Sequence, residues 1–66
     1  MVTLTQLNEF VVFAKYLNIS KAADVLFTSQ SNLSKHLKQL ESDLGFNLTY
    51  KKGNNIYLTD EGSHFL

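Results

Sequence analysis

The side chains best able to do chemistry in this chain of 66 residues lie between Ser29 and Leu44. We treat this segment as a helix with about 100° of rotation per residue and take Leu33 as the origin. One side of this helix, between roughly 100° and 200°, then carries Ser31, Ser34, Lys35 and Lys38. Gln30 lies at the leading end. Hydroxyl, amide and ammonium groups can bond to base edges and phosphates. The pattern therefore predicts a helix that reads the major groove of double-stranded DNA.

Leucines occupy the other side of the same segment. On the same projection, Leu37, Leu40 and Leu44 fall within roughly 40° of Leu33. The four leucines predict a narrow buried seam. The acids Glu41 and Asp43 come only in the last turn, where a recognition helix docking by its N-terminal half keeps them from phosphates. A polar outer face alone would fit any surface helix. The short helix and tight turn before this segment favour a helix-turn-helix instead.

Two further helices are expected before this segment. The first is capped by Thr3 or Thr5, and its core face is formed by Leu7, Phe10, Val11, Ala14 and Leu17. The second helix is expected over Lys21 to Phe27, with Ser20 as its cap. Its pair of adjacent alanines allows another helix to approach closely. The third helix, about 30–44, is expected to start after a Ser29 cap and to end at Gly45.

Beyond Gly45 the period changes from that of a helix to that of a strand. Phe46, Leu48 and Tyr50 alternate with polar residues, "KGNN" forms a turn, and Ile56 and Leu58 flank Tyr57. This predicts a two-stranded β-hairpin over about 46–58. Thr59, followed by two acids, predicts the start of a further helix. The order of elements predicts a mainly α fold, a winged helix-turn-helix with three helices, a hairpin wing and the start of a last helix.

The net charge of zero argues against a protein that binds polyanions, since six lysines and no arginine face six acids. Residues 25–40 and 44–59, however, each contain two lysines and no acid, so a balanced total leaves room for one basic face. Lys51 and Lys52 flank the expected hairpin tip, where they could reach phosphates or a minor groove. Lys21, near the start of the second helix, could bind a phosphate. The alternative for all three lysines is simple solvation.

No enzymatic or metal site is expected. The chain has no cysteine, and His36 and His64 have no ligand spacing. Ser34 and His36 diverge by roughly 200° on a helix, so they cannot form a nucleophile and base pair. The chain also lacks a signal peptide or a membrane-spanning run, so we expect no membrane partner and a cytoplasmic location.

The stretch "FVVFAKYLNISKAADVLFTSQSNLSKHLKQLESDLGFNL", followed by "YLTDEG", resembles the N-terminal DNA-binding domain of LysR-type transcriptional regulators. The resemblance covers nearly the whole chain. It implies that Gln30, Ser31, Ser34 and Lys35 contact bases, that Lys38 contacts a phosphate, and that Asn54 stands where the wing often carries arginine. With the lysines considered above, the full set of expected backbone and wing contacts is Lys21, Ser29, Lys38, Lys51, Lys52 and Asn54.

The resemblance also implies an organisation beyond the helix-turn-helix. Residues 1–58 would form the DNA-binding domain, and 59–66 would begin a linker helix through which the regulator forms a homodimer or higher homo-oligomer. A small-molecule effector would bind an absent C-terminal domain, so no cofactor is expected in this one.

Three residues depart from the family's usual pattern. Ser31 stands where proline is very frequent and adds a backbone donor. Lys35 stands where arginine is common, and it cannot make the two-pronged contact of arginine to guanine. Thr49 replaces a frequent core phenylalanine, and we expect Tyr50 to fill some of that space. The alternative function is a winged helix used as a protein-protein interaction module, which would show an exposed apolar patch.

Overall fold

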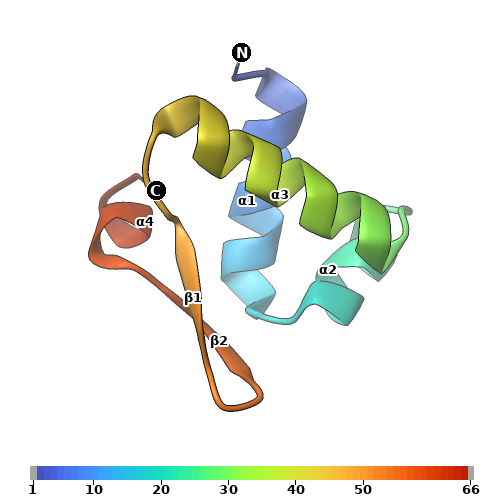
Figure 1. Cartoon of the computed structure of the whole chain (residues 1–66). Coiled ribbons are helices and arrows are strands. Elements are labelled where there is room, and N and C mark those ends of the chain that lie inside the picture. The colour runs from blue at the N-terminus through green and yellow to red at the C-terminus, as the bar shows by residue number, and fades with distance from the viewer. Residues whose placement is uncertain (1, 66) are drawn as a thin grey trace.

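The computed structural model describes residues 2–65 as three packed helices with a hairpin and a short helix beside them (Figure 1). In chain order the elements are α1 (Leu4–Tyr16), α2 (Ile19–Val25), α3 (Gln30–Leu44), β1 (Thr49–Lys52), β2 (Asn55–Leu58) and α4 (Asp60–Phe65). The winged helix-turn-helix predicted from the sequence is confirmed. None of the helices in this part of the chain is long and apolar enough to cross a membrane.

Helix α1 starts as predicted, but its buried face is different. Thr3 is the cap, and it exchanges two hydrogen bonds with Gln6, because its Oγ1 accepts from the Gln6 N–H while its own N–H donates to Gln6 Oε1. Phe10 and Phe13 are buried, whereas Val11 is 53% exposed. The expectations for Val11 and Leu17 are therefore wrong. Both neighbouring helices pack on the side of Phe10 and Phe13, and Leu17 lies past the helix as its left-handed C-cap.

Helix α2 begins two residues earlier than the position that a Ser20 cap would require. The cap is Asn18, whose Oδ1 accepts from the Lys21 N–H at 3.0 Å. Ala22 and Ala23 are fully buried between the helices, which confirms the predicted close approach. The turn to α3 holds Phe27 in a left-handed conformation with its side chain almost entirely exposed.

Both ends of α3 match the sequence prediction. The Ser29 Oγ accepts from the Asn32 N–H at 3.0 Å, and Gly45 ends the helix with φ 83°. Leu33 and Leu40 are fully buried, while Leu37 and Leu44 are half-buried. The leucine seam is therefore confirmed, with two of its members at the centre of the core.

The seam joins two apolar clusters. One holds Leu33 against Phe13 and the two alanines of α2, and so unites the three helices. The other holds Leu40 against Phe10 and Leu48, which brings in the base of the wing. Full burial of each of these large side chains contributes about 1.5–3 kcal/mol. Most of the stability of so small a domain must come from these contacts.

The hairpin forms as predicted, except that the apolar alternation of β1 is shifted by one residue. Thr49 pairs with Leu58 and Lys51 with Ile56, so these four residues share one face. Tyr50 pairs with Tyr57 on the opposite, exposed face, with ring centroids 5.6 Å apart. Leu48 is buried from a bend that precedes the strand, and this bend breaks the alternation. The expectation that Tyr50 fills core space is therefore wrong.

Two polar contacts attach the wing to the helices. The Glu41 carboxylate of α3 accepts from the backbone N–H groups of Leu48 and Thr49, at 2.7 and 3.2 Å. Thr59 donates its hydroxyl to the Asn47 carbonyl and accepts from the Gly62 N–H, which makes it the expected cap of α4. The described part of the predicted linker segment, 59–65, is thus fastened to the loop before β1. Leu66 lies outside the described residues.

Gly62 is the closest point between α4 and the wing. A Cβ added there would collide with the backbone carbonyl of Leu48. That carbonyl cannot easily move, since it accepts from the Thr59 N–H at 3.0 Å. The side chain of Leu48 is itself in the core.

Replacement of Gly62 by alanine should therefore destabilise the fold, although alanine is the better helix former. We expect a loss of about 1–3 kcal/mol in the free energy of unfolding, the usual cost of overpacking. Urea denaturation followed by circular dichroism measures this loss. Ser63→Ala, at the exposed neighbouring position, is the control, and an unfolding midpoint equal to that of the wild type in Gly62→Ala would contradict the packing described.

Replacement of Glu41 by alanine should also destabilise the fold, because it leaves two partly buried N–H groups without their acceptor. The expected loss in the free energy of unfolding is about 1–3 kcal/mol. Faster amide hydrogen exchange at Leu48 and Thr49 would identify the wing attachment as the part that loosens. In Ser42→Ala, at the next, exposed position, exchange at both amides should stay slow.

Candidate nucleic-acid interface

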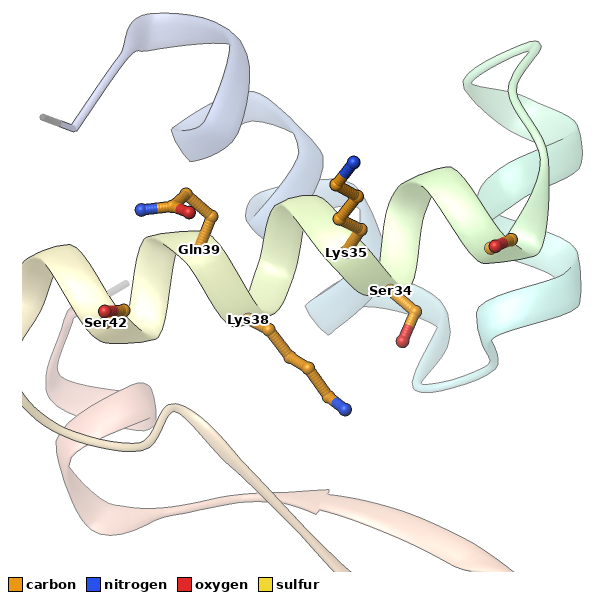
Figure 2. A pocket seen from close by; sticks show the side chains of 6 residues that line it. Ser34, Lys35, Lys38, Gln39 and Ser42 are labelled. Carbon is orange, nitrogen blue, oxygen red and sulfur yellow. The ribbon is translucent and has the colours of Figure 1, made fainter.

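The polar side of α3 is exposed along three turns of the helix. One continuous outward surface is lined by Ser31, Ser34, Lys35, Lys38, Gln39 and Ser42. In Figure 2, Ser34 and Lys38 point toward the side of the hairpin, while Lys35 and Gln39 point the other way. All six are exposed, so nothing in the protein's own body covers this face.

A groove of about 720 Å³ separates this face from the wing. Its floor is apolar and is made by Phe13, Ile19, Leu37 and Ile56. Its polar lining includes Gln30, Ser31, Ser34 and Lys38 from α3 and Lys51 and Asn54 from the wing. The structure thus brings six of the ten residues predicted from the sequence to one concave surface. Lys35 lies outside the groove, on the same helix face.

The two wing lysines differ in their placement. Lys51 lines the groove, and it pairs with Ile56 on the inner face of the hairpin. Lys52 follows it directly and therefore points to the opposite face, since side chains alternate along a strand. Lys51 and Lys38 accordingly flank the groove from its two sides, and Lys52 does not line it.

Lys21 and Ser29 lie outside the groove as well. Lys21 is exposed near the start of α2, but its backbone N–H is already bonded to Asn18. That N–H is therefore not free to donate to a phosphate beside Lys21. Ser29 uses its oxygen to cap α3, which leaves its hydroxyl hydrogen to donate outward.

Carboxylates near α3 are engaged with the protein itself. Glu41 borders the groove, yet its carboxylate accepts two backbone N–H groups of the wing. Asp43 accepts from the Gln39 amide at 3.1 Å. These contacts explain how a chain with no net charge can still present lysines without adjacent free acids on one surface.

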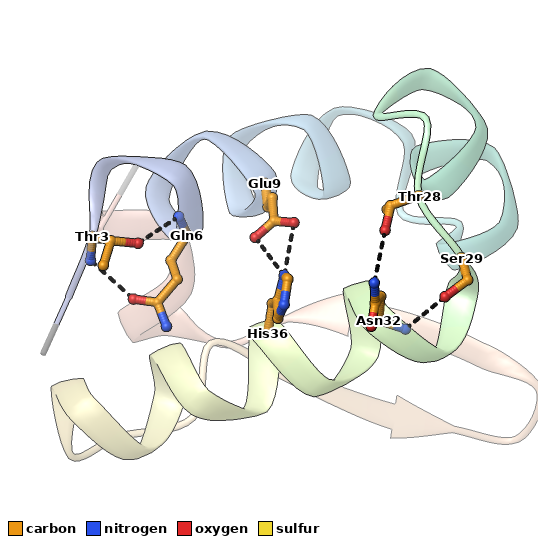
Figure 3. A network of polar contacts seen from close by, with 7 residues as sticks. All are labelled: Thr3, Gln6, Glu9, Thr28, Ser29, Asn32 and His36. Carbon is orange, nitrogen blue, oxygen red and sulfur yellow. Dashed lines mark hydrogen bonds and ion pairs between the residues drawn. The ribbon is translucent and has the colours of Figure 1, made fainter.

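Sequence reasoning missed the polar contact that joins α1 to α3. The Nδ1 of His36 lies 3.1 and 3.0 Å from the two oxygens of the buried Glu9 carboxylate (Figure 3). The partners are 27 positions apart, so no local motif reveals them. The one available signal was an acid directly beside Phe10, within the apolar face of α1.

The described residues 2–65 contain no group of three or more histidines, cysteines or acids that could hold a metal ion. The two histidines have separate surroundings: His36 contacts Glu9, and His64 lies exposed in the last turn of α4.

Comparison with known proteins points to one family. Residues 4–63 match the family described as "Bacterial regulatory helix-turn-helix protein, lysR family". The HTH-type transcriptional regulator CitR of Bacillus subtilis (strain 168) is 47% identical over 60 residues, which cover 91% of this chain and 21% of CitR. The chain thus spans about a fifth of the length of that relative.

Solved structures agree with this assignment. A crystal structure of a CbnR_DBD-DNA complex superposes with a TM-score of 0.90 and 33% identity, over 97% of this chain and 74% of that one. Vibrio fischeri DarR in complex with DNA gives a TM-score of 0.91 and 34% identity, over 98% of this chain and 22% of that one. The match over residues 4–63, together with these neighbours, shows that the chain belongs to the lysR family of bacterial regulatory helix-turn-helix proteins.

Proposed function

We propose that this domain binds double-stranded DNA sequence-specifically and so directs a bacterial LysR-type regulator to its promoters. Helix α3, residues 30–44, would lie in the major groove, and the wing, about 46–58, would lie on the minor groove and backbone. The observation that carries the proposal is the polar face of α3, which is fully exposed opposite its buried leucine seam and continues into the groove beside the wing. Two of the similar structures, CbnR_DBD and DarR, are complexes with DNA.

Within this interface the side chains have different roles. The base-reading residues would be Gln30, Ser31, Ser34 and Lys35, because they lie in the N-terminal half of α3 that enters a groove in such folds. Backbone contacts would come from Lys21, Ser29, Lys38, Lys51, Lys52 and Asn54. We expect Lys38 and Lys51 to make the most important phosphate contacts, since they flank the groove of the protein. The DNA backbone that separates the major from the minor groove would pass through it.

The whole regulator would contain more than this domain. Residues 59–66 would begin a linker helix that joins two copies, and two recognition helices about 34 Å apart would then meet successive major grooves. An effector domain would follow, and the DNA-binding domain itself would hold no cofactor and catalyse nothing. A cytoplasmic location follows from a role in transcription.

The alternative function, a protein-protein interaction module, has less support. The outward face of α3 carries no large exposed apolar side chain. Such side chains lie on other parts of the described chain, over several elements: Leu4, Val11, Leu17, Val25, Phe27, Tyr50, Tyr57 and Phe65. Phe65 at the end of α4 is 37% exposed, and its ring packs against Phe10 and Phe46, with centroids 5.9 and 6.4 Å apart.

The base-reading assignment predicts that alanine at Ser34 or Lys35 changes the preferred DNA sequence. Selection of bound duplexes from a random pool, by the wild-type chain and by each variant, should show relaxed preference at one or two positions. The expected loss of discrimination there is about 1–3 kcal/mol per base. Lys15→Ala removes a lysine from α1 and should leave the preference as it is. Identical preferences in the wild type and in both α3 variants would remove these residues from the reading surface.

The placement of the wing lysines predicts that Lys51→Ala weakens binding more than Lys52→Ala does. Loss of one phosphate contact reduces the dependence of log affinity on log salt by a slope of about 1. Fluorescence anisotropy with one labelled duplex, across a series of salt concentrations, gives this slope for both variants. The two substitutions remove the same charge from adjacent positions. Equal slopes for the two variants would therefore contradict the prediction that Lys51 contributes more to phosphate binding than Lys52 does.

A further inference from the structure

We propose that Glu9, His36 and Glu41 are positioning residues that fix the rotation of α3 about its own axis, and hence the register in which its side chains meet bases. The inference rests on the proposed function. None of the three belongs to the predicted reading set, and the contacts of each one lie within the protein.

The first contact is a directional bond between α1 and α3. Both oxygens of Glu9 lie within 3.1 Å of His36 Nδ1, and the Glu9 side chain is only 8% exposed. The Nδ1–H group donates to a carboxylate both in the cationic ring and in one neutral tautomer. A buried carboxylate needs such a partner, because an unpaired buried charge is very costly. Helix α3 is therefore bonded to α1 at His36.

The second contact lies on the opposite flank of the leucine seam. On the projection that places Leu33 at the origin, the seam is centred near 10°, His36 lies at roughly −60° and Glu41 at roughly 80°. Glu41 accepts from two wing N–H groups, so α3 is bonded to α1 on one side and to the wing on the other. Bonds on both flanks of a contact line resist rotation in either direction.

The apolar seam alone resists rotation less strongly. Burial of leucine is non-directional and depends mainly on the area removed from water. A rotation of about 10° moves a side-chain tip by about 1 Å at the helix surface, which lies ~5–6 Å from the axis. A displacement of that size costs the seam little area, yet it breaks hydrogen bonds to base edges. Base reading therefore needs contacts that are directional.

The decisive variant is Glu9→Met. Methionine is unbranched, favours helices and removes the buried charge together with the bond. His36 keeps its access to water, since its side chain is 43% exposed. The substitution therefore leaves no unpaired charge in the core, and the unfolding midpoint in urea should change little. The preference for the selected duplex over a scrambled duplex of equal composition should nevertheless drop about tenfold, the scale of one mismatched base pair.

Matched variants separate positioning from other roles. Glu9→Gln keeps an oxygen that can accept from the imidazole, so it should retain most of the preference. Glu61→Met removes the same charge from an exposed position of α4 and should change the affinity for both duplexes equally. The dependence of affinity on salt should be the same in Glu9→Met as in the wild type, because the number of phosphate contacts does not change.

The outcomes are distinguishable. A wild-type preference close to one would refute the proposed function itself. A clear wild-type preference that persists in Glu9→Met, or that falls equally far in Glu9→Gln, would refute the positioning role alone. Any loss of folded protein lowers both affinities by the same factor and cancels from their ratio, so the test holds even if Glu9→Met is less stable.

Discussion

The burial of one leucine seam determines the rest of this small domain. Leu33 and Leu40 are fully buried, and each belongs to a different apolar cluster, so α3 is the element that joins the helical pack to the wing. Because one side of α3 must face this core, its opposite side must face outward, and the chain places its hydroxyl and ammonium groups there. The stability of the fold and the exposure of the interface are two results of the same contact.

Two carboxylates next to the seam are bonded to other parts of the protein. A protein with as many acids as lysines can still offer a surface to a polyanion if the nearby carboxylates are bonded inside the protein. Glu9 and Glu41 are used in this way, one on the imidazole of His36 and the other on backbone N–H groups of the wing. Each carboxylate has its hydrogen-bond partners inside the protein and adds a link between elements.

Much of the fold was predictable because its signals are local. The Ser29 cap, the Gly45 stop, the paired alanines and the Thr59 start depend on neighbouring residues, and the structure confirms all four. The errors came where tertiary contacts decide. Asn18 and Ser20 are both good caps, and only packing selects the first. The bend at Leu48 reverses the faces of β1, and the Glu9 to His36 contact joins residues distant in sequence. The candidate reading residues were predictable as a helix face, while the groove that adds Lys51 to them required the position of the hairpin.

The close approach of Gly62 to the Leu48 carbonyl couples the position of α4 to that of the wing. With no side chain between them, the first turn of α4 and the base of the wing are in direct contact, and Thr59 binds both. A change in the tilt of α4 would therefore have to displace the Leu48 carbonyl, and with it the residues that lead into β1.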